Sequence, residues 1–460
     1  MLKRLSFAMR LLACLSLWTY CNAANSLISN AGLATVTDGA ASEFFSLNGS
    51  IEDDLTAEAR AQIPVRDAGT FSKLFVRVFS NTTTTAVATV TLRKSLADTA
   101  LLVSITAGTT GIFEDQTNTV AFAATDEADY EFTVPNQTGS AKTVSITQVG
   151  VQFAPDTAGN SISFLAATGN AGGFFSESTT LYYPPSGGSF FDTPFEANTK
   201  YRIRVATTTS DFYVYIQSNA RTTATTFGTR KNGAAGAQSV SVGATATGAF
   251  EDTTNSDSLA DGDDYNYFST TGTGTGTIVP IVGCTTAITT GGEFFLIAND
   301  AVGSSFPANQ TSYSPPAGGN FGPTPTEANI QIYPRFTFTA RQLQSSILTN
   351  TVTATSTITL RDNGANGNES LSIPSSTTGL FVDASNTDTI TSGTDEINYQ
   401  VVTGATGTSM DILHISVLGD TDVGPPPSSD APVQIIQSQN QATPGIGQAL
   451  GGRPPRGQWR

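Results

Sequence analysis

Apolar and polar side chains alternate along short segments throughout the chain. Residues 88–93 (ATVTLR) alternate strictly, and residues 75–79 form a run of β-branched and aromatic side chains. A period of two is that of a half-buried β-strand, whereas a helix-like pattern is confined to a short run at 55–63. About eight strand-like segments fall in each third of the chain, which is typical of sandwiches and jelly rolls. The pattern therefore predicts an all-β protein of β-sandwich or jelly-roll domains.

Three segments share one sequence core, which indicates three tandem copies of one domain. In each copy an Arg precedes a Phe by 20 residues, and the Phe positions (113, 250 and 381) are 137 and 131 residues apart. This period is domain-sized, whereas solenoids and propellers repeat at about 20–50 residues. The expected organisation is a signal peptide at 1–23, domains at 24–157, 158–289 and 290–420, and a flexible, disordered tail at 421–460 rich in Pro, Gly and Gln.

Copies two and three resemble each other more closely than either resembles copy one. Both carry an Asn-Gly pair between two strand-like runs, at 232–233 and 363–364, and this pair suits a tight hairpin turn. Copy one has residues 95–98 (SLAD) there, so we expect a looser hairpin. It also has the helix-like run at 55–63 where the others have a Pro-Pro and Gly-Gly loop. These differences indicate a specialised first domain.

The first 23 residues have the features of an export signal. Basic residues precede a short apolar run at 11–20, and small residues follow it up to Ala23. An alternative interpretation takes Cys14 as the lipidated cysteine of a lipobox. Removal of residues 1–23 leaves 19 basic and 38 acidic residues, a formal charge of −19, and such a chain repels nucleic acid and anionic membranes. No later segment is apolar enough for a transmembrane helix, so we expect a secreted protein, extracellular or at a cell surface.

The order of features in each copy resembles the jelly-roll domains of the complement and tumour-necrosis-factor-like proteins. Those domains show an alternating strand, an Asn-Gly hairpin, a second strand, and a Gly-Asp turn before a late strand. In copy two these features are residues 225–230, 232–233 and 238–242, then 262–263 before Tyr267. The resemblance implies a jelly roll for each copy and implies little about function.

The shared core also carries an acidic and an amide residue. In each copy an Asp lies two residues after the shared Phe and three residues before an Asn. Side-chain oxygens of Asp and Asn on loops are the hard ligands that Ca²⁺ takes. The same pair can instead cap a turn through hydrogen bonds to backbone N–H groups, and the sequence leaves both interpretations open. The candidate Ca²⁺ ligands are Asp115, Asn118, Asp252, Asn255, Asp383 and Asn386.

An aromatic cluster in copy two is a second candidate site. It surrounds a Pro-Pro and Gly-Gly loop that stiffens the chain. Aromatic rings in such a place stack on the sugars of a glycan ligand or seal a junction between domains. The cluster consists of Tyr182, Tyr183, Phe190 and Phe191.

Side chains for catalysis are scarce. His414 is the one histidine and lies in a strand-like run, where we expect a core residue, and neither a Gly-x-Ser-x-Gly elbow nor a phosphate loop occurs. Cys284 is the one cysteine after the signal peptide, and we expect it in the core, with pairing between chains as the alternative. Two carboxylates suffice for glycoside chemistry, but a catalytic pair is not expected to recur in three copies. We therefore expect a protein that is not an enzyme.

These features favour a non-catalytic extracellular structural protein, such as a surface-layer, fibre or matrix subunit. Its expected partners are further copies of itself, or matrix and surface glycans, and not nucleic acid. Two alternatives stay open. One is an adhesin that recognises glycans or surfaces, with or without Ca²⁺, and the other is a carboxylate-based polysaccharide-active enzyme.

Overall fold

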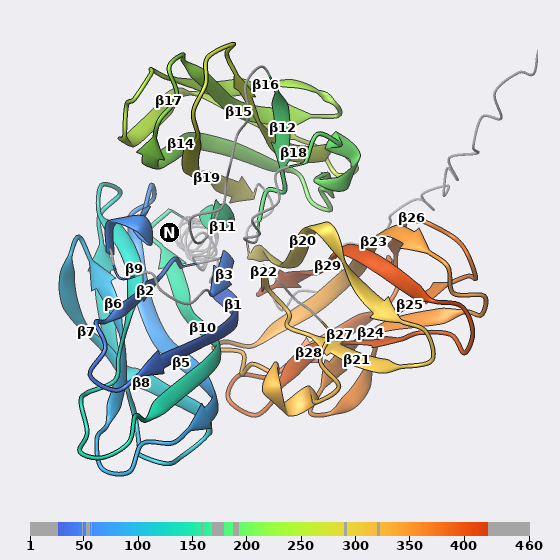
Figure 1. Cartoon of the computed structure of the whole chain (residues 1–460). Coiled ribbons are helices and arrows are strands. Elements are labelled where there is room, and N and C mark those ends of the chain that lie inside the picture. The colour runs from blue at the N-terminus through green and yellow to red at the C-terminus, as the bar shows by residue number, and fades with distance from the viewer. Residues whose placement is uncertain are drawn as a thin grey trace, which may run out of the picture. The chain divides into compact units, whose positions relative to one another are not determined.

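The computed structural model describes residues 26–421, with gaps at 48, 52–55, 57, 158–159, 168–178, 187–192, 289–291 and 320–322. The predicted signal peptide and most of the predicted tail lie outside the described residues. Within them the chain is built of β-strands, joined by short turns and three short 3₁₀ turns (Figure 1). The expectation of an all-β fold of several sandwiches is confirmed.

Sandwich 1 takes its strands from residues 26–155. They are β1 (Ser26–Thr37), β2 (Glu43–Phe45), β3 (Gly49–Ile51), β4 (Ile63–Pro64), β5 (Gly69–Asn81), β6 (Ala88–Lys94), β7 (Ala97–Ile105), β8 (Gly111–Phe122), β9 (Glu127–Thr133) and β10 (Thr143–Pro155), with the 3₁₀ turn η1 (Glu58–Arg60). One sheet has the order β3-β1-β10-β5-β8 and the other β2-β9-β6-β7, with β4 beside β9. Apolar side chains of both sheets, including Phe71, Phe132 and Tyr130, fill the space between them.

Sandwich 2 repeats this order with residues 160–288. Its elements are β11 (Asn160–Ala167), β12 (Thr180–Tyr183), η2 (Glu196–Asn198), β13 (Tyr201–Arg202), β14 (Thr207–Asn219), β15 (Thr225–Lys231), β16 (Ala234–Val242), β17 (Gly248–Leu259), β18 (Asp264–Thr271) and β19 (Ile278–Ile288). The sheets have the orders β11-β19-β14-β17 and β12-β18-β15-β16, with β13 beside β18. Its core includes Phe212, Phe227 and Tyr267.

Sandwich 3 does the same with residues 293–420. Its elements are β20 (Glu293–Pro307), β21 (Thr311–Ser314), β22 (Gly318–Gly319), η3 (Glu327–Asn329), β23 (Phe338–Asn350), β24 (Ser356–Asp362), β25 (Ala365–Ile373), β26 (Gly379–Val382), β27 (Thr387–Ile390), β28 (Ile397–Val402) and β29 (Ser409–Asp420). The sheets have the orders β22-β20-β29-β23-β26, with β27 also on β23, and β21-β28-β24-β25. In each sandwich the first and last long strands are neighbours, and this strand order is that of a jelly roll.

The hairpin between β6 and β7 is as tight as its two counterparts, so the expectation of a looser turn is wrong. Lys94 pairs with Ala97, which leaves a two-residue turn, and Ser95 and Leu96 adopt φ of 48° and 70°. The Asn-Gly pairs have φ of 52° and 79° at 232–233 and of 52° and 72° at 363–364. The pairing of the two strands therefore imposes a left-handed turn on residues that disfavour it.

The helix-like run expected at 55–63 is also corrected. The described residues form the 3₁₀ turn η1, and sandwiches 2 and 3 have the same turn, η2 and η3, at the equivalent place. The sequence signal is a Glu-Ala pair, at 58–59, 196–197 and 327–328. Sandwich 1 therefore shares this element with the others.

We expect Leu96→Gly to raise the thermal midpoint of unfolding. A leucine with φ of 70° is strained, and relief of such strain contributes about 1 kcal/mol. The gain is partly offset because glycine is more flexible in the unfolded chain. The matched control is Gly233→Leu in sandwich 2, which should lower the midpoint. A lower midpoint for Leu96→Gly would contradict the argument.

Candidate functional site

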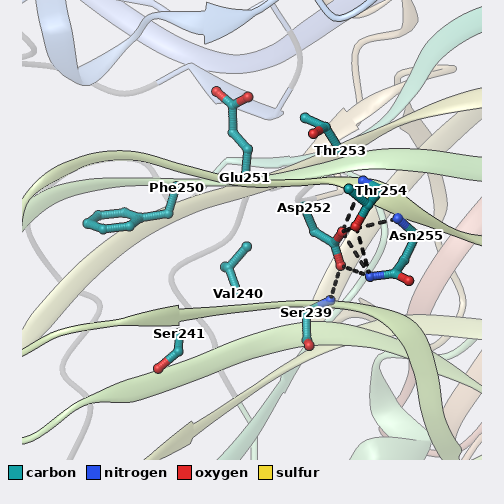
Figure 2. A pocket seen from close by; sticks show the side chains of 9 residues that line it. All are labelled: Ser239, Val240, Ser241, Phe250, Glu251, Asp252, Thr253, Thr254 and Asn255. Carbon is teal, nitrogen blue, oxygen red and sulfur yellow. Dashed lines mark hydrogen bonds between the residues drawn. The ribbon is translucent and has the colours of Figure 1, made fainter.

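The recurring aspartate joins the edges of the two sheets in a sandwich. Asp252 lies on β17 at the edge of one sheet, and its Oδ2 accepts the N–H of Ser239 on β16, the edge strand of the other, at 3.0 Å. Its Oδ1 accepts the backbone N–H groups of Thr254 and Asn255 at 3.2 and 3.1 Å. The Asn255 side-chain amide donates to both oxygens, at 3.0 and 2.9 Å (Figure 2). We call this arrangement the edge clamp.

The same edge clamp occurs in sandwiches 1 and 3. Asp115 accepts the N–H of Leu102 on β7 at 3.1 Å, and Asp383 accepts the N–H of Ser370 on β25 at 3.0 Å. The side-chain amides of the predicted asparagines, Asn118 and Asn386, each donate to their aspartate at 2.8 Å. Each predicted Asp–Asn pair is therefore brought together, and the three pairs lie in three separate sandwiches.

The edge clamp changes the acidity of its aspartate. Burial raises the pKa of Asp252, but the hydrogen bonds from Asn255, Ser239 and Thr254 outweigh burial and lower it to about 2. The pKa values of Asp115 and Asp383 are lowered by the same kind of bonds. All three aspartates are thus ionised acceptors of N–H groups at neutral pH.

These contacts favour the turn-capping interpretation over Ca²⁺ binding. In each clamp the amide nitrogen of the asparagine, and not its oxygen, contacts the carboxylate. Within the described part of the chain no group of three or more His, Cys, Asp or Glu side chains could hold a metal ion. Ca²⁺ binding stays an untested prediction without a supporting contact.

A shallow hollow of about 440 Å³ lies beside the edge clamp of sandwich 2, between β16 and β17. Phe250 and Val240 line one end, and Asp252 and Asn255 lie at the other, while Glu251 points away from them (Figure 2). The carboxylate and the amide donors are already bonded to one another. The polar end of the hollow is therefore occupied by the protein's own contacts.

A second recurring contact holds the 3₁₀ turn to the hairpin. Arg230 Nε and Nη2 donate to the two oxygens of Glu196 at 3.0 and 2.9 Å. Such bidentate pairs restrict both side chains to one geometry. Sequence reasoning missed this pair, although the shared Glu-Ala could have revealed it. The equivalent pairs are Arg93 with Glu58, at 2.8 and 3.0 Å, and Arg361 with Glu327, at 2.8 and 3.1 Å.

The predicted aromatic cluster is described only in part. Tyr183 is buried, and its hydroxyl is 2.9 Å from that of Ser269 in the same sandwich. The guanidinium carbon of Arg230 lies 5.5 Å from the ring centre of Tyr182. Phe190 and Phe191 lie outside the described residues. The two tyrosines therefore take part in contacts of sandwich 2 itself, with β18 and with the recurring arginine.

One arginine in each sandwich, eight residues after the 3₁₀ glutamate, contacts the next sandwich. These arginines lie at equivalent places, which the sequence signal Glu-Ala-x₆-Arg marks. The contacts run from sandwich 1 to 2, from 2 to 3, and from 3 to 1. They are an ion pair of Arg66 with Glu251, a hydrogen bond of Arg204 to Gln342 at 3.3 Å, and an ion pair of Arg335 with Glu114 at 2.7 Å.

Cys284 is enclosed in the core of sandwich 2. It is 1% exposed, and the hydroxyls of Tyr267 and Tyr265 lie 3.1 and 3.5 Å from its sulfur. Burial raises the pKa of its thiol to about 12. The thiol is therefore protonated and inaccessible in the folded protein, which favours the predicted core role over pairing between chains.

Asp129 is a buried acid whose charge is only partly offset by Arg93, its partner on β6. It is fully buried, neither carboxylate oxygen has a hydrogen-bond partner among the described residues, and burial raises its pKa well above the ordinary value. The register places Asn266 and Asn398 at the same position in the other sandwiches. Asn266 donates to Thr199 Oγ1 at 3.0 Å. An asparagine therefore suits this position better than an aspartate.

Comparison of the sequence with protein-family models gives no match, and comparison with curated proteins gives none either. Among solved structures, the chain is similar to a Paenibacillus xanthan lyase, with 13% identity and a TM-score of 0.16. The alignment covers 77% of this chain and 38% of the lyase chain, and a TM-score this low carries no argument about fold or activity. No helix among the described residues has the length and apolar character needed to cross a membrane.

We expect Asp252→Asn to lower the free energy of unfolding by about 1–3 kcal/mol, because an amide NH₂ cannot accept the N–H groups that the clamp presents. The pKa of Asp252 is lowered from 3.8 to about 2. Its contribution is therefore present above pH 3.8 and lost as the pH falls towards 2, so the two proteins should converge at low pH. Chemical denaturation at pH 7 and pH 2.5 measures this.

Thr253→Ala, at an exposed side chain of the same strand, is the control and should leave stability unchanged. Added Ca²⁺ or EGTA should shift none of the midpoints. A Ca²⁺-dependent rise that Asp252→Asn abolishes would restore the Ca²⁺ interpretation.

We expect Asp129→Asn to stabilise the protein by about 1–2 kcal/mol at pH 7, because it removes a desolvated carboxylate. A raised pKa means that the stability contribution of Asp129 is lost as the pH rises above 3.8. The gain should therefore be smaller at pH 4.5 than at pH 7 in urea denaturation. Asn266→Asp should be destabilising with the opposite pH dependence. A loss of stability in Asp129→Asn at pH 7 would contradict this account.

Proposed function

We propose that the protein is a non-catalytic extracellular structural protein, a subunit of a surface layer, fibre or matrix. The observation that carries the proposal is how the recurring polar groups are used. The edge-clamp aspartates, the 3₁₀ glutamates and the hairpin arginines all bind within their own sandwich, and a further arginine in each contacts the next one. Groups used in this way maintain a rigid body and are not free for chemistry.

The predicted export signal at 1–23 supports secretion. The proposed partners are further copies of the chain, or glycans of the extracellular matrix or of surfaces. The adhesin alternative gains no support from the described aromatic residues, since Tyr183 is buried and Tyr182 lies against Arg230. It stays the second choice, and the polysaccharide-active enzyme the third.

Electron microscopy of the native material tests the proposal. We expect ordered arrays or filaments that contain this chain, because a structural subunit works as an assembly. Dispersed single particles at native concentration would contradict the structural role. Binding to a glycan array under the same conditions would then favour the adhesin, and the array should be probed with Ca²⁺ and with EGTA.

A further inference from the structure

We propose that the junction between sandwiches 2 and 3 is an acid-sensitive switch, which opens when His414 takes up a proton and exposes apolar surface to a second copy of the chain. The role of this surface in assembly rests on the proposed function. The switch itself rests on the geometry of the junction.

His414 lies at the junction and faces sandwich 2. It is 2% exposed on β29, and the centre of its ring is 5.4 Å from that of Tyr201 on β13 of sandwich 2. Leu418 lies four residues after His414 on β29, so the two side chains point to the same face of the strand, and Leu418 packs with the core of sandwich 2. Opening the junction would therefore expose the His414 side chain to solvent.

The groups around His414 offer no charge to a protonated imidazole. Asn299 is its partner on β20 and Ser346 its partner on β23, and both are neutral. The hydroxyl of Tyr201 has its pKa raised to about 12 by burial and so stays neutral. Nε2 of His414 has no hydrogen-bond partner among the described residues.

Among the described residues, the carboxylates on the elements of this junction pair with arginines: Asp264 with Arg202, and Glu293 and Asp420 with Arg341. Arg202 contributes its carbonyl to Gln344 Nε2 at 3.0 Å, and Arg204 binds Gln342 and Asp261. Burial alone lowers the pKa of His414 to about 4. The closed junction therefore holds a neutral imidazole, and a proton would place an unpaired charge in a buried contact.

Protonation of His414 favours the open form of the junction. In the open form His414 is exposed and titrates near its ordinary pKa of 6.5. As the pH falls from 6.5 towards 4, the equilibrium shifts towards the open form by at most about tenfold per pH unit. Acidification from pH 6.5 to 4.5 thus shifts the equilibrium by about 40-fold towards opening.

Opening exposes a continuous apolar strip. Phe295, Ile297 and Leu418 of sandwich 3 are all nearly fully buried and pack with the core of sandwich 2. The Tyr201 ring contacts that of Phe295 edge to face, with ring centres 5.9 Å apart. Because the strip of one copy matches the sandwich 2 face of another, a second copy can cover it with the contacts that the closed junction makes.

Sandwiches 1 and 2 have no histidine at the position that is equivalent to His414. The register places Gln148 of sandwich 1 and Ile281 of sandwich 2 where sandwich 3 has His414. Gln148 donates to the carbonyl of Ile330 at 2.7 Å. These residues supply the substitutions for a test, because the fold already accepts them there.

The experiment compares the full chain with His414→Gln by hydrogen exchange at pH 7, 5.5 and 4.5. After correction for intrinsic rates, we expect protection of β13 and β20 in the unchanged protein to fall about eightfold from pH 7 to 5.5 and about sevenfold from pH 5.5 to 4.5. Protection in His414→Gln should stay constant, as should that of β15 in both proteins. An equal loss in His414→Gln would overturn the switch, and His414→Ile provides the same comparison if the glutamine variant does not fold.

Electron microscopy of the same samples separates this inference from the proposed function. Assembly that increases on acidification in the unchanged protein but not in the variant supports both. Assembly that is equal in both proteins at every pH overturns the role of the strip and leaves the structural function standing. Loss of protection without any assembly overturns the structural function and leaves the switch standing.

Discussion

A buried guanidinium needs an acceptor, and three equivalent arginines meet this need in two ways. Arg66 and Arg335 find carboxylates on β17 and β8 of the next sandwich. The equivalent of those carboxylates in sandwich 3 is Val382, and Arg204 instead binds Gln342 and Asp261. Loss of one partner from a buried ion pair costs more than the pair itself contributes. The arginines therefore make the sandwiches depend on one another.

The junctions also differ in how the central strands meet. In sandwich 1 the ring of Phe75 covers Gly150, and in sandwich 2 the ring of Tyr213 covers Gly283. A Cβ on Gly150 would come within 2.6 Å of the Phe75 ring, and one on Gly283 within 2.8 Å of the Tyr213 ring. The register places Gln344 and Ser416 at this position in sandwich 3, where Tyr201 of sandwich 2 supplies the aromatic ring. The junction that holds His414 is thus the most polar of these contacts.

The fold class follows from the alternation of side chains, because a half-buried strand imposes a period of two. The tight turn at Ser95 and Leu96 does not follow, since strand pairing on both sides overrides the local preference of these residues. The role of the recurring Asp and Asn also stays ambiguous in the sequence, because an asparagine side chain offers both a ligand oxygen and an N–H donor. The aspartate that holds the asparagine amide is itself bonded to the neighbouring edge strand, and residue spacing does not reveal that contact.

Contacts between sandwiches are the least visible in the sequence. Arg66 and Glu251 are separated by 185 residues, and no sequence pattern links one to the other. The shared Glu-Ala-x₆-Arg spacing marks the arginine, but only the packing of two sandwiches reveals its partner. The unusual burial of His414 likewise depends on Tyr201 of another sandwich.

Arg66, Arg204 and Arg335 have different partners, and this limits the order in which the three sandwiches can follow one another along the chain. A cyclic permutation that keeps the order 1-2-3 keeps every donor beside its acceptor. Exchanging the first and third sandwiches reverses the order and brings Arg66 opposite Val382, where sandwich 3 has no carboxylate to pair with it. The three sandwiches are thus similar in fold but no longer interchangeable in position, and their order along the chain has become part of the information that specifies the molecule.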